Sequence, residues 1–157
     1  MNAYRSKPFV FPWPPLVFAA AILSALTLQR FFPVIMPDTN VLAWRAVGFL
    51  LIGAAVCLDV WAMRTLLDNH TTVLPHRCSS HLVTTGPYRF TRNPIYLGYT
   101  LITTGIGLIL QNPWFLAGAV AAIAVTTVIS VRREELHLLS RFGIEFETYC
   151  RRTARWI

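Results

Sequence analysis

The sequence predicts an all-α integral membrane protein with about four transmembrane helices and a cytoplasmic C-terminal helix. Hydrophobic residues make up 55% of the 157 residues and charged residues only 13%, whereas about a quarter of a soluble domain is charged. Four apolar runs come close to the ~20 helical residues that cross a bilayer core. We find no repeat and no separate polar domain, so we expect residues 1–157 to form a single membrane domain.

We expect the spans at residues 13–32, 41–63, 94–110 and 113–131. Arg5 and Lys7 precede the first span, but its apolar run is longer than a signal-peptide core and lacks a cleavage site, so we expect it to be retained. The second span carries an acid, Asp59, which either pairs with an arginine of the following loop or borders a pocket. Only Gln111 and Asn112 lie between the last two spans, and Pro113 is typical of a helix start, which predicts a tight antiparallel hairpin.

Basic residues predict the orientation of these spans. The chain has 14 basic and 7 acidic residues, and of the basic ones only Arg30 and Arg45 fall on the side opposite the rest. The positive-inside rule therefore places both termini and residues 64–93 in the cytoplasm, and we expect a bacterial inner membrane. In a soluble protein this excess would suggest nucleic acid. Here it follows topology, so we expect membrane lipids and no nucleic acid as partners.

The chain enters its third predicted span through a polar loop. Gly86-Pro87 is typical of a turn, and Asn93-Pro94 is typical of a helix start with Asn as the N-cap. The free N–H groups of such a helix start favour a carboxylate or a phosphate, and Arg89 and Arg92 add donors beside it. Three tyrosines lie near the same helix start: Tyr88, Tyr96 and Tyr99. Composition alone leaves open whether this is a ligand site or a belt against lipid headgroups.

Two adjacent acids, Glu134 and Glu135, follow the fourth predicted span. If the helix continues, Glu135 shares a face with Leu138 and Phe142, where a carboxylate is costly unless it is paired. Either the two preceding arginines neutralise both acids on an amphipathic tail, or the acids belong to a site. The apolar-side position of Glu135 favours a site.

Histidines and cysteines are the remaining candidates for metal binding. His70, His76 and His81 are six and five residues apart, which matches no standard zinc pattern, and no cysteine pair completes the set. We therefore expect no metal site, and we expect the three cysteines to be free thiols in a reducing compartment.

The motifs of the second half resemble those of the isoprenylcysteine carboxyl methyltransferase and phospholipid methyltransferase superfamily. In chain order the matching segments are Leu82-Val83-Thr84-Thr85-Gly86-Pro87-Tyr88, Arg92-Asn93-Pro94-Ile95-Tyr96-Leu97-Gly98, Glu134-Glu135 with Phe142-Gly143, and Tyr149. The resemblance covers about residues 70–157. It implies an S-adenosylmethionine-dependent methyltransferase that binds its cofactor at the cytoplasmic face, without a Rossmann fold, and acts on a lipophilic or lipid-attached acceptor.

The same resemblance implies where the cofactor binds, over about residues 70–98 and 132–150. The residues expected to contact S-adenosylmethionine are His81, Leu82, Val83, Tyr88, Asn93, Pro94, Ile95, Tyr96, Glu134 and Glu135. Glu134 and Arg133 are the catalytic candidates. The start of the third span would suit the methionine carboxylate, and Glu134 would suit the ammonium group or the ribose hydroxyls.

Two positions depart from the isoprenylcysteine branch of this superfamily. Asn93 stands where that branch usually has His, and Ser130 stands where it has Arg. The resemblance therefore implies methyl transfer but leaves the acceptor open among an isoprenylcysteine-like carboxylate, a phospholipid amine and a thiol. The alternatives are a non-catalytic membrane accessory protein of the same fold and, less favoured, an NADPH-dependent membrane reductase.

Overall fold

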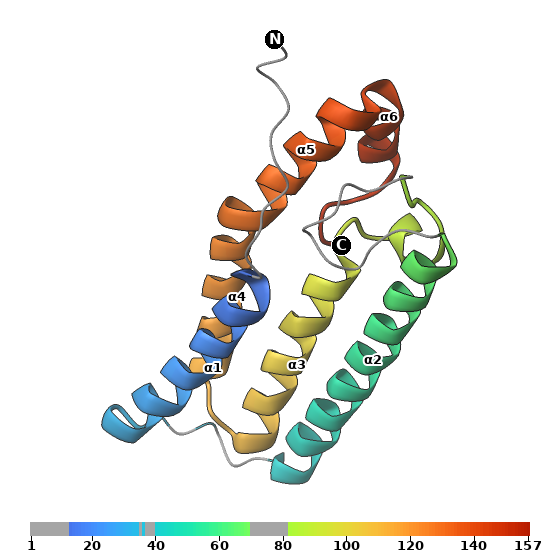
Figure 1. Cartoon of the computed structure of the whole chain (residues 1–157). Helices are drawn as coiled ribbons and strands as arrows, with labels where there is room; N and C mark the ends of the chain where they lie inside the picture. The colour runs from blue at the N-terminus through green and yellow to red at the C-terminus, as the bar shows by residue number, and fades with distance from the viewer. Residues whose placement is uncertain (1–12, 35, 37–39, 70–81) are drawn as a thin grey trace.

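The computed structural model describes residues 13–34, 36, 40–69 and 82–157, and within them the regular elements are all helical. The four longer helices lie side by side, while residues 82–93, here called the loop before α3, and the helices α5 and α6 gather at one end (Figure 1). The elements, in chain order, are α1 (Trp13–Phe31), α2 (Val41–Asp68), the 3₁₀ turn η2 (Gly86–Arg89), α3 (Pro94–Leu110), α4 (Trp114–Thr126), the π-helical η3 (Thr127–Val131), α5 (Arg132–Phe142) and α6 (Ile144–Arg152).

The predicted all-α membrane class is confirmed, and three helices of the described part are long and apolar enough to cross a membrane. These are Trp13–Phe31, Val41–Asp68 and Trp114–Phe142, the last formed by α4, η3 and α5 in one continuous run. The predicted span over residues 94–110 is an apolar helix with those same bounds, but its 17 residues are fewer than in the other three. The predicted spans therefore lie on helices, and length and composition support three of the four as crossings.

In the helix bundle, α4 packs on α1 and α3, α1 also contacts α3, and α3 packs on α2 (Figure 1). Glycine lets α2 and α3 approach closely: a Cβ atom on Gly105 would lie 2.7 Å from the carbonyl oxygen of Gly48. Gly107 likewise lets α3 approach α4, because a Cβ atom there would lie 2.5 Å from Cβ of Phe115. These small residues serve packing within the molecule.

The tight hairpin between α3 and α4 is confirmed. Gln111 ends α3 with a left-handed φ of 53°. The buried side chain of Asn112 accepts a hydrogen bond from the backbone N–H of Trp114 (3.0 Å) and donates one to the carbonyl oxygen of Ala25 (3.2 Å). Asn112 therefore ties the hairpin to α1, and Pro113 precedes the first residue of α4.

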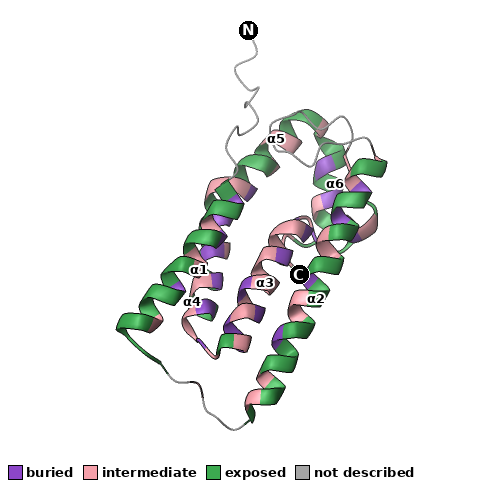
Figure 2. Ribbon diagram, turned by 60° about the horizontal axis from the view of Figure 1, so that its bottom comes forward, coloured by how far each residue is buried: buried purple, intermediate pink, exposed green. Residues whose placement is uncertain are grey.

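Many residues of the helices are exposed (Figure 2), and large apolar side chains are among them. On α2, Leu42 is 79% exposed and Leu50 is 72% exposed, whereas Ala55 and Ala62 are fully buried. Water would penalise such a surface, and hydrocarbon would not. This surface and the three long apolar helices support an integral membrane protein.

Candidate functional site

The site begins with the loop before α3, which rests on the last turns of α2. Gly86 has a left-handed φ of +59°, and a Cβ atom there would lie 2.5 Å from Oγ1 of Thr65. Pro87 is buried directly after it, and Tyr88 N–H donates to the carbonyl oxygen of Thr85 (3.2 Å). Only glycine fits both this conformation and this closeness to α2, so Gly86 fixes the turn that presents Tyr88.

The C-terminal segment after α6 holds the same loop from the other side. The backbone N–H of Arg92 donates to the carbonyl oxygen of Ala154 (3.0 Å). The side chains of Thr91 and Asn93 both donate to the carbonyl oxygen of Arg155, at 3.3 and 2.9 Å. Asn93 and Pro94 do occupy the N-cap and first positions of α3, as predicted, but the Asn93 side chain makes no capping bond. It binds the C-terminal segment instead.

Glu135 connects α5 to both of these segments. Its carboxylate forms ion pairs with Arg92 (3.0 Å) and with Arg155 (2.6 Å), and Nε of Arg155 also donates to it (2.9 Å). The Glu135 side chain is only 18% exposed, so these pairs are partly shielded from water. Hydrogen bonding to Glu135 raises the pKa of Arg155, against a lowering by burial. The charge of Glu135 is thus compensated by residues distant in sequence.

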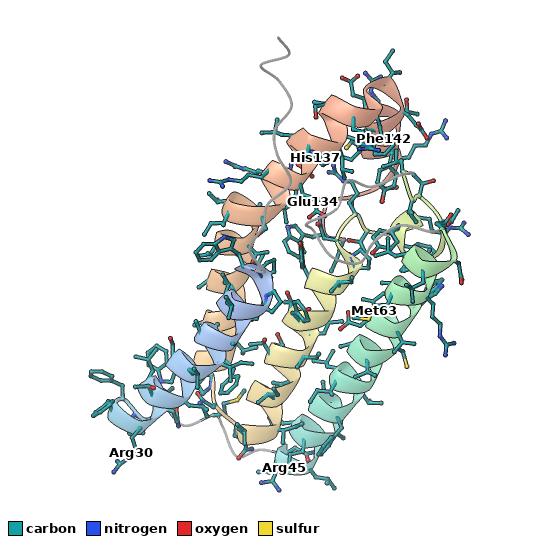
Figure 3. The ribbon with its side chains drawn as sticks, viewed as in Figure 1. Arg30, Arg45, Met63, Glu134, His137 and Phe142 are labelled. Atoms are coloured by element: carbon teal, nitrogen blue, oxygen red, sulfur yellow. The ribbon has the colours of Figure 1, made fainter. Side chains whose placement is uncertain are left out.

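Glu134, one residue earlier on α5, has a different partner. The hydroxyl of Tyr96, in the first turn of α3, donates to Oε2 of Glu134 at 3.3 Å. Glu134 is an exposed residue of α5. Figure 3 shows Glu134 and His137 on α5 toward the loop end of the molecule, and Arg30 and Arg45 at the opposite end. The contact joins the start of α3 to the acid of α5.

Two tyrosines connect these groups further. The hydroxyl of Tyr149, on α6, donates to the carbonyl oxygen of Tyr88 (2.6 Å). Burial raises the pKa of Tyr88, and the charges of Glu134, Tyr149 and Asp59 raise it further. Burial likewise raises the pKa of Tyr149, against a lowering by Arg92. Both phenols therefore stay protonated at neutral pH, and Glu134 lies within electrostatic reach of Tyr88.

Most of the residues predicted for the site lie in the described part of the chain. Leu82 and Val83 are half-buried where the described loop begins, Ile95 is half-buried in the first turn of α3, and Arg133 is exposed on α5. His81, together with His70 and His76, lies outside the described residues. In the described part no group of three His, Cys, Asp or Glu side chains could hold a metal ion.

Sequence reasoning missed Arg155 and the segment around it. Its contacts reach back more than sixty residues to Thr91 and Asn93, and no local pattern marks such pairing. Tyr149 was noted only as the end of a motif, which was the available signal. The site is thus built from the loop, the start of α3, α5 and the C-terminal segment.

Comparison with known proteins shows the family to which the chain belongs. The family model described as phospholipid methyltransferase matches residues 43–145, which include both Tyr96 and Glu134. The chain belongs to the phospholipid methyltransferase family. This confirms the resemblance drawn from the motifs.

Individual relatives point the same way. The chain is 32% identical to protein-S-isoprenylcysteine O-methyltransferase of Mus musculus over 145 residues, or 87% of this chain and 50% of the relative. For the Homo sapiens protein of that name the values are 32%, 87% and 49%. A shorter match, 39% identical over 77 residues, covers 49% of this chain and 36% of nickel-cobalt-cadmium resistance protein NccN of Alcaligenes xylosoxydans xylosoxydans. The chain spans about half the length of the methyltransferases it matches, and no solved structure matches it.

Proposed function

We propose that this member of the phospholipid methyltransferase family is an S-adenosylmethionine-dependent methyltransferase that acts at the cytoplasmic membrane face. The observation that carries the proposal is the hydrogen bond between Tyr96 and Glu134. It joins two motifs that lie 38 residues apart and that both fall inside the family match. The names of the mouse and human relatives, which are methyltransferases, support the same activity.

The residues at this end of the molecule fit the chemistry of S-adenosylmethionine. The first turn of α3 carries N–H groups without helical partners, which suit the methionine carboxylate. The exposed carboxylate of Glu134 suits the ammonium group or the ribose hydroxyls, and the rings of Tyr88 and Tyr96 offer faces for the remainder. His81, Leu82 and Val83 complete the proposed binding set. When bound, the cofactor supplies a methyl group that its sulfonium already activates.

The chain's own residues would then contribute alignment and exclusion of water. Tyr96 holds the Glu134 carboxylate by its hydrogen bond, and Glu135 fixes α5 against the loop through its two arginines. The side-chain amide of Asn93 donates a hydrogen bond to the carbonyl oxygen of Arg155, and this bond orients the start of α3. A carboxylate acceptor needs no base, whereas an amine acceptor does, and Glu134, His137 or a water are the candidates for that role, with Arg133 nearby on α5.

The proposed topology has α3 as a fourth membrane crossing. Its 17 residues rise about 25 Å along the helix axis, and a locally thinner bilayer accommodates that length. Both termini and the loop then lie in the cytoplasm, in a bacterial inner membrane. The acceptor enters from the lipid and carries an isoprenylcysteine-like carboxylate, a phospholipid amine or a thiol. No nucleic acid takes part.

The direct experiment is calorimetric titration of the detergent-solubilised protein with S-adenosylmethionine, and with NADPH as the comparison ligand. Saturable heat with S-adenosylmethionine alone is expected. No heat from protein whose helical circular dichroism is intact would refute the methyltransferase proposal, and heat with NADPH alone would favour a reductase. Transfer of labelled methyl groups to a prenylated cysteine, to phosphatidylethanolamine or to a thiol then identifies the acceptor. Cofactor binding without transfer to any of them would favour an accessory role.

A further inference from the structure

Asp59 is an acid placed within the apolar run of α2. It lies nine residues before the last residue of that helix, Asp68, which corresponds to about 14 Å along the axis. Its neighbours in sequence are apolar, and the helix around it is long and apolar enough to cross a membrane. A carboxylate at such a depth is costly unless it is compensated, and it is a functional candidate for that reason.

The carboxylate of Asp59 lies directly against α3. A Cβ atom on Gly98 would lie 2.6 Å from Cγ of Asp59, so residue 98 can carry no side chain while Asp59 keeps this position. Gly98 is the last residue of the Arg92–Gly98 motif, and it follows Tyr96 by two positions. The Asp59 carboxylate therefore lies against the first turns of α3. The same part of α3 carries Tyr96, the hydrogen-bond partner of Glu134.

In the described part of the chain this carboxylate is not compensated. Its Oδ1 atom is buried and has no hydrogen-bond partner, and the ion pairs there involve Glu135 instead. Asp59 does act electrostatically on Tyr88 and on Tyr99, and the ring of Tyr99 lies 5.7 Å from that of Phe18 on α1. Asp59 and Glu134 thus both act on Tyr88, from α2 and from α5.

We propose that Asp59 binds the positively charged sulfonium of the methyl donor; this rests on the function proposed above. An ammonium group needs about three hydrogen-bond acceptors, and the single buried Oδ1 atom of Asp59 is a poor match for it. A sulfonium has no N–H or O–H to donate, so a carboxylate stabilises it by charge, without such acceptors. The unpartnered carboxylate against Gly98, within electrostatic reach of Tyr88 and Tyr99, suits a cation of this kind.

Comparing two ligands in one variant tests the proposal. Asp59→Asn should lower the affinity for S-adenosylmethionine at least about tenfold, and change that for S-adenosylhomocysteine, which lacks the sulfonium charge, by less than about threefold. Gly98→Ala should have the same selective effect by displacing the carboxylate. Asp68→Asn is the matched control, because Asp68 is an exposed acid on the same helix, and it should change neither affinity. Equal losses for both ligands, or no loss, would overturn the proposal.

A measurement without ligand separates binding from a structural role. Because the Asp59 carboxylate is uncompensated, ligand-free Asp59→Asn should melt at or above the temperature of the wild type. A lower melting temperature would mean that Asp59 stabilises the fold, and would overturn the proposal. If the wild type binds neither compound, the proposed function fails and takes this inference with it. An unchanged preference between the two compounds in Asp59→Asn refutes the inference alone.

Discussion

Glu134 and Glu135 are adjacent in sequence and serve different partners. Successive helical residues point about 100° apart, so the two carboxylates leave α5 in different directions. One meets Tyr96 and remains exposed, and the other is bound by Arg92 and Arg155. The structure therefore gives the two acids different partners, a single tyrosine for Glu134 and two arginines from distant segments for Glu135.

Replacing each acid by its amide should separate these roles. Glu135→Gln leaves two arginines without their carboxylate, and because the pairs are partly exposed we expect a loss of about 1–2 kcal/mol of stability. Glu134→Gln should melt like the wild type and lose affinity for S-adenosylmethionine. Thermal melting without ligand measures the first effect. Melting of Glu135→Gln at the wild-type temperature would show that the ion pairs contribute nothing.

Gly86 provides a second residue-scale prediction. Gly86→Ala should destabilise the protein by about 1–2 kcal/mol, because it combines a left-handed backbone with a clash against Thr65. Gly53→Ala is the control, since a Cβ atom there meets nothing within 4 Å and alanine favours a helix. Thermal melting should show Gly86→Ala below the wild type and Gly53→Ala at or above it. The reverse order would contradict the role assigned to this turn.

At the scale of elements, the C-terminal segment and the loop before α3 form one unit. Thr91 and Ala154 form an isolated parallel bridge, and Arg155 contributes both its carbonyl oxygen and its side chain to the contact. The start of α3 is thus positioned by the end of the chain. Changes at Arg155 should reach the candidate site without touching a ligand.

Arg155→Ala should lower the melting temperature and weaken the affinity for S-adenosylmethionine a few-fold, because Glu135 on α5 loses one of its two arginine partners. The hydrogen bonds of Thr91 and Asn93 to the backbone carbonyl of residue 155 remain available. Arg151→Ala removes an exposed arginine of α6 and is the matched control. Calorimetry and melting of the two variants check the expectation. Equal melting temperatures and equal affinities in the two variants would show that the Arg155 side chain does not position the candidate site.

The elements also show what sequence could and could not predict. Helices at residues 13–32, 94–110 and 113–131 follow from apolar length and from punctuation at Asn93-Pro94 and Pro113, which are local signals. The π-helical turn Thr127–Val131 was not predicted, because no sequence pattern encodes its altered hydrogen bonding. The partners of Glu135 were not predicted either, since they depend on contacts between distant segments. Motifs therefore located the site residues, whereas their pairing required the structure.

At the scale of the whole molecule, the positions of the arginines indicate how the protein is oriented in the membrane. Arg30 and Arg45 lie at the end opposite Glu134 and His137 (Figure 3), and the long helices between the two ends carry many exposed apolar side chains. The placement of the arginines agrees with the charge bias of the sequence. It predicts which end faces the cytoplasm.

Thiol labelling in intact cells tests that orientation. The tip of the α3–α4 hairpin is a poor place for a reporter, because Asn112 is only 3% exposed. Arg30→Cys, at an exposed position, should instead react with a membrane-impermeant maleimide from outside, and Arg151→Cys should react only after permeabilisation. Both variants are compared with a parent that lacks the native cysteines. Labelling in the opposite pattern would invert the topology.

The central claim is that Tyr96 and Glu134 form one binding unit for the methyl donor. The most direct measurement is a double-mutant cycle on the affinity for S-adenosylmethionine, with Tyr96→Phe, Glu134→Gln and the combined variant. We expect each single change to weaken binding about tenfold, and the double variant to be little weaker than either, because the two residues act through one hydrogen bond. Unchanged affinity in both single variants, or losses that simply add, would contradict the account.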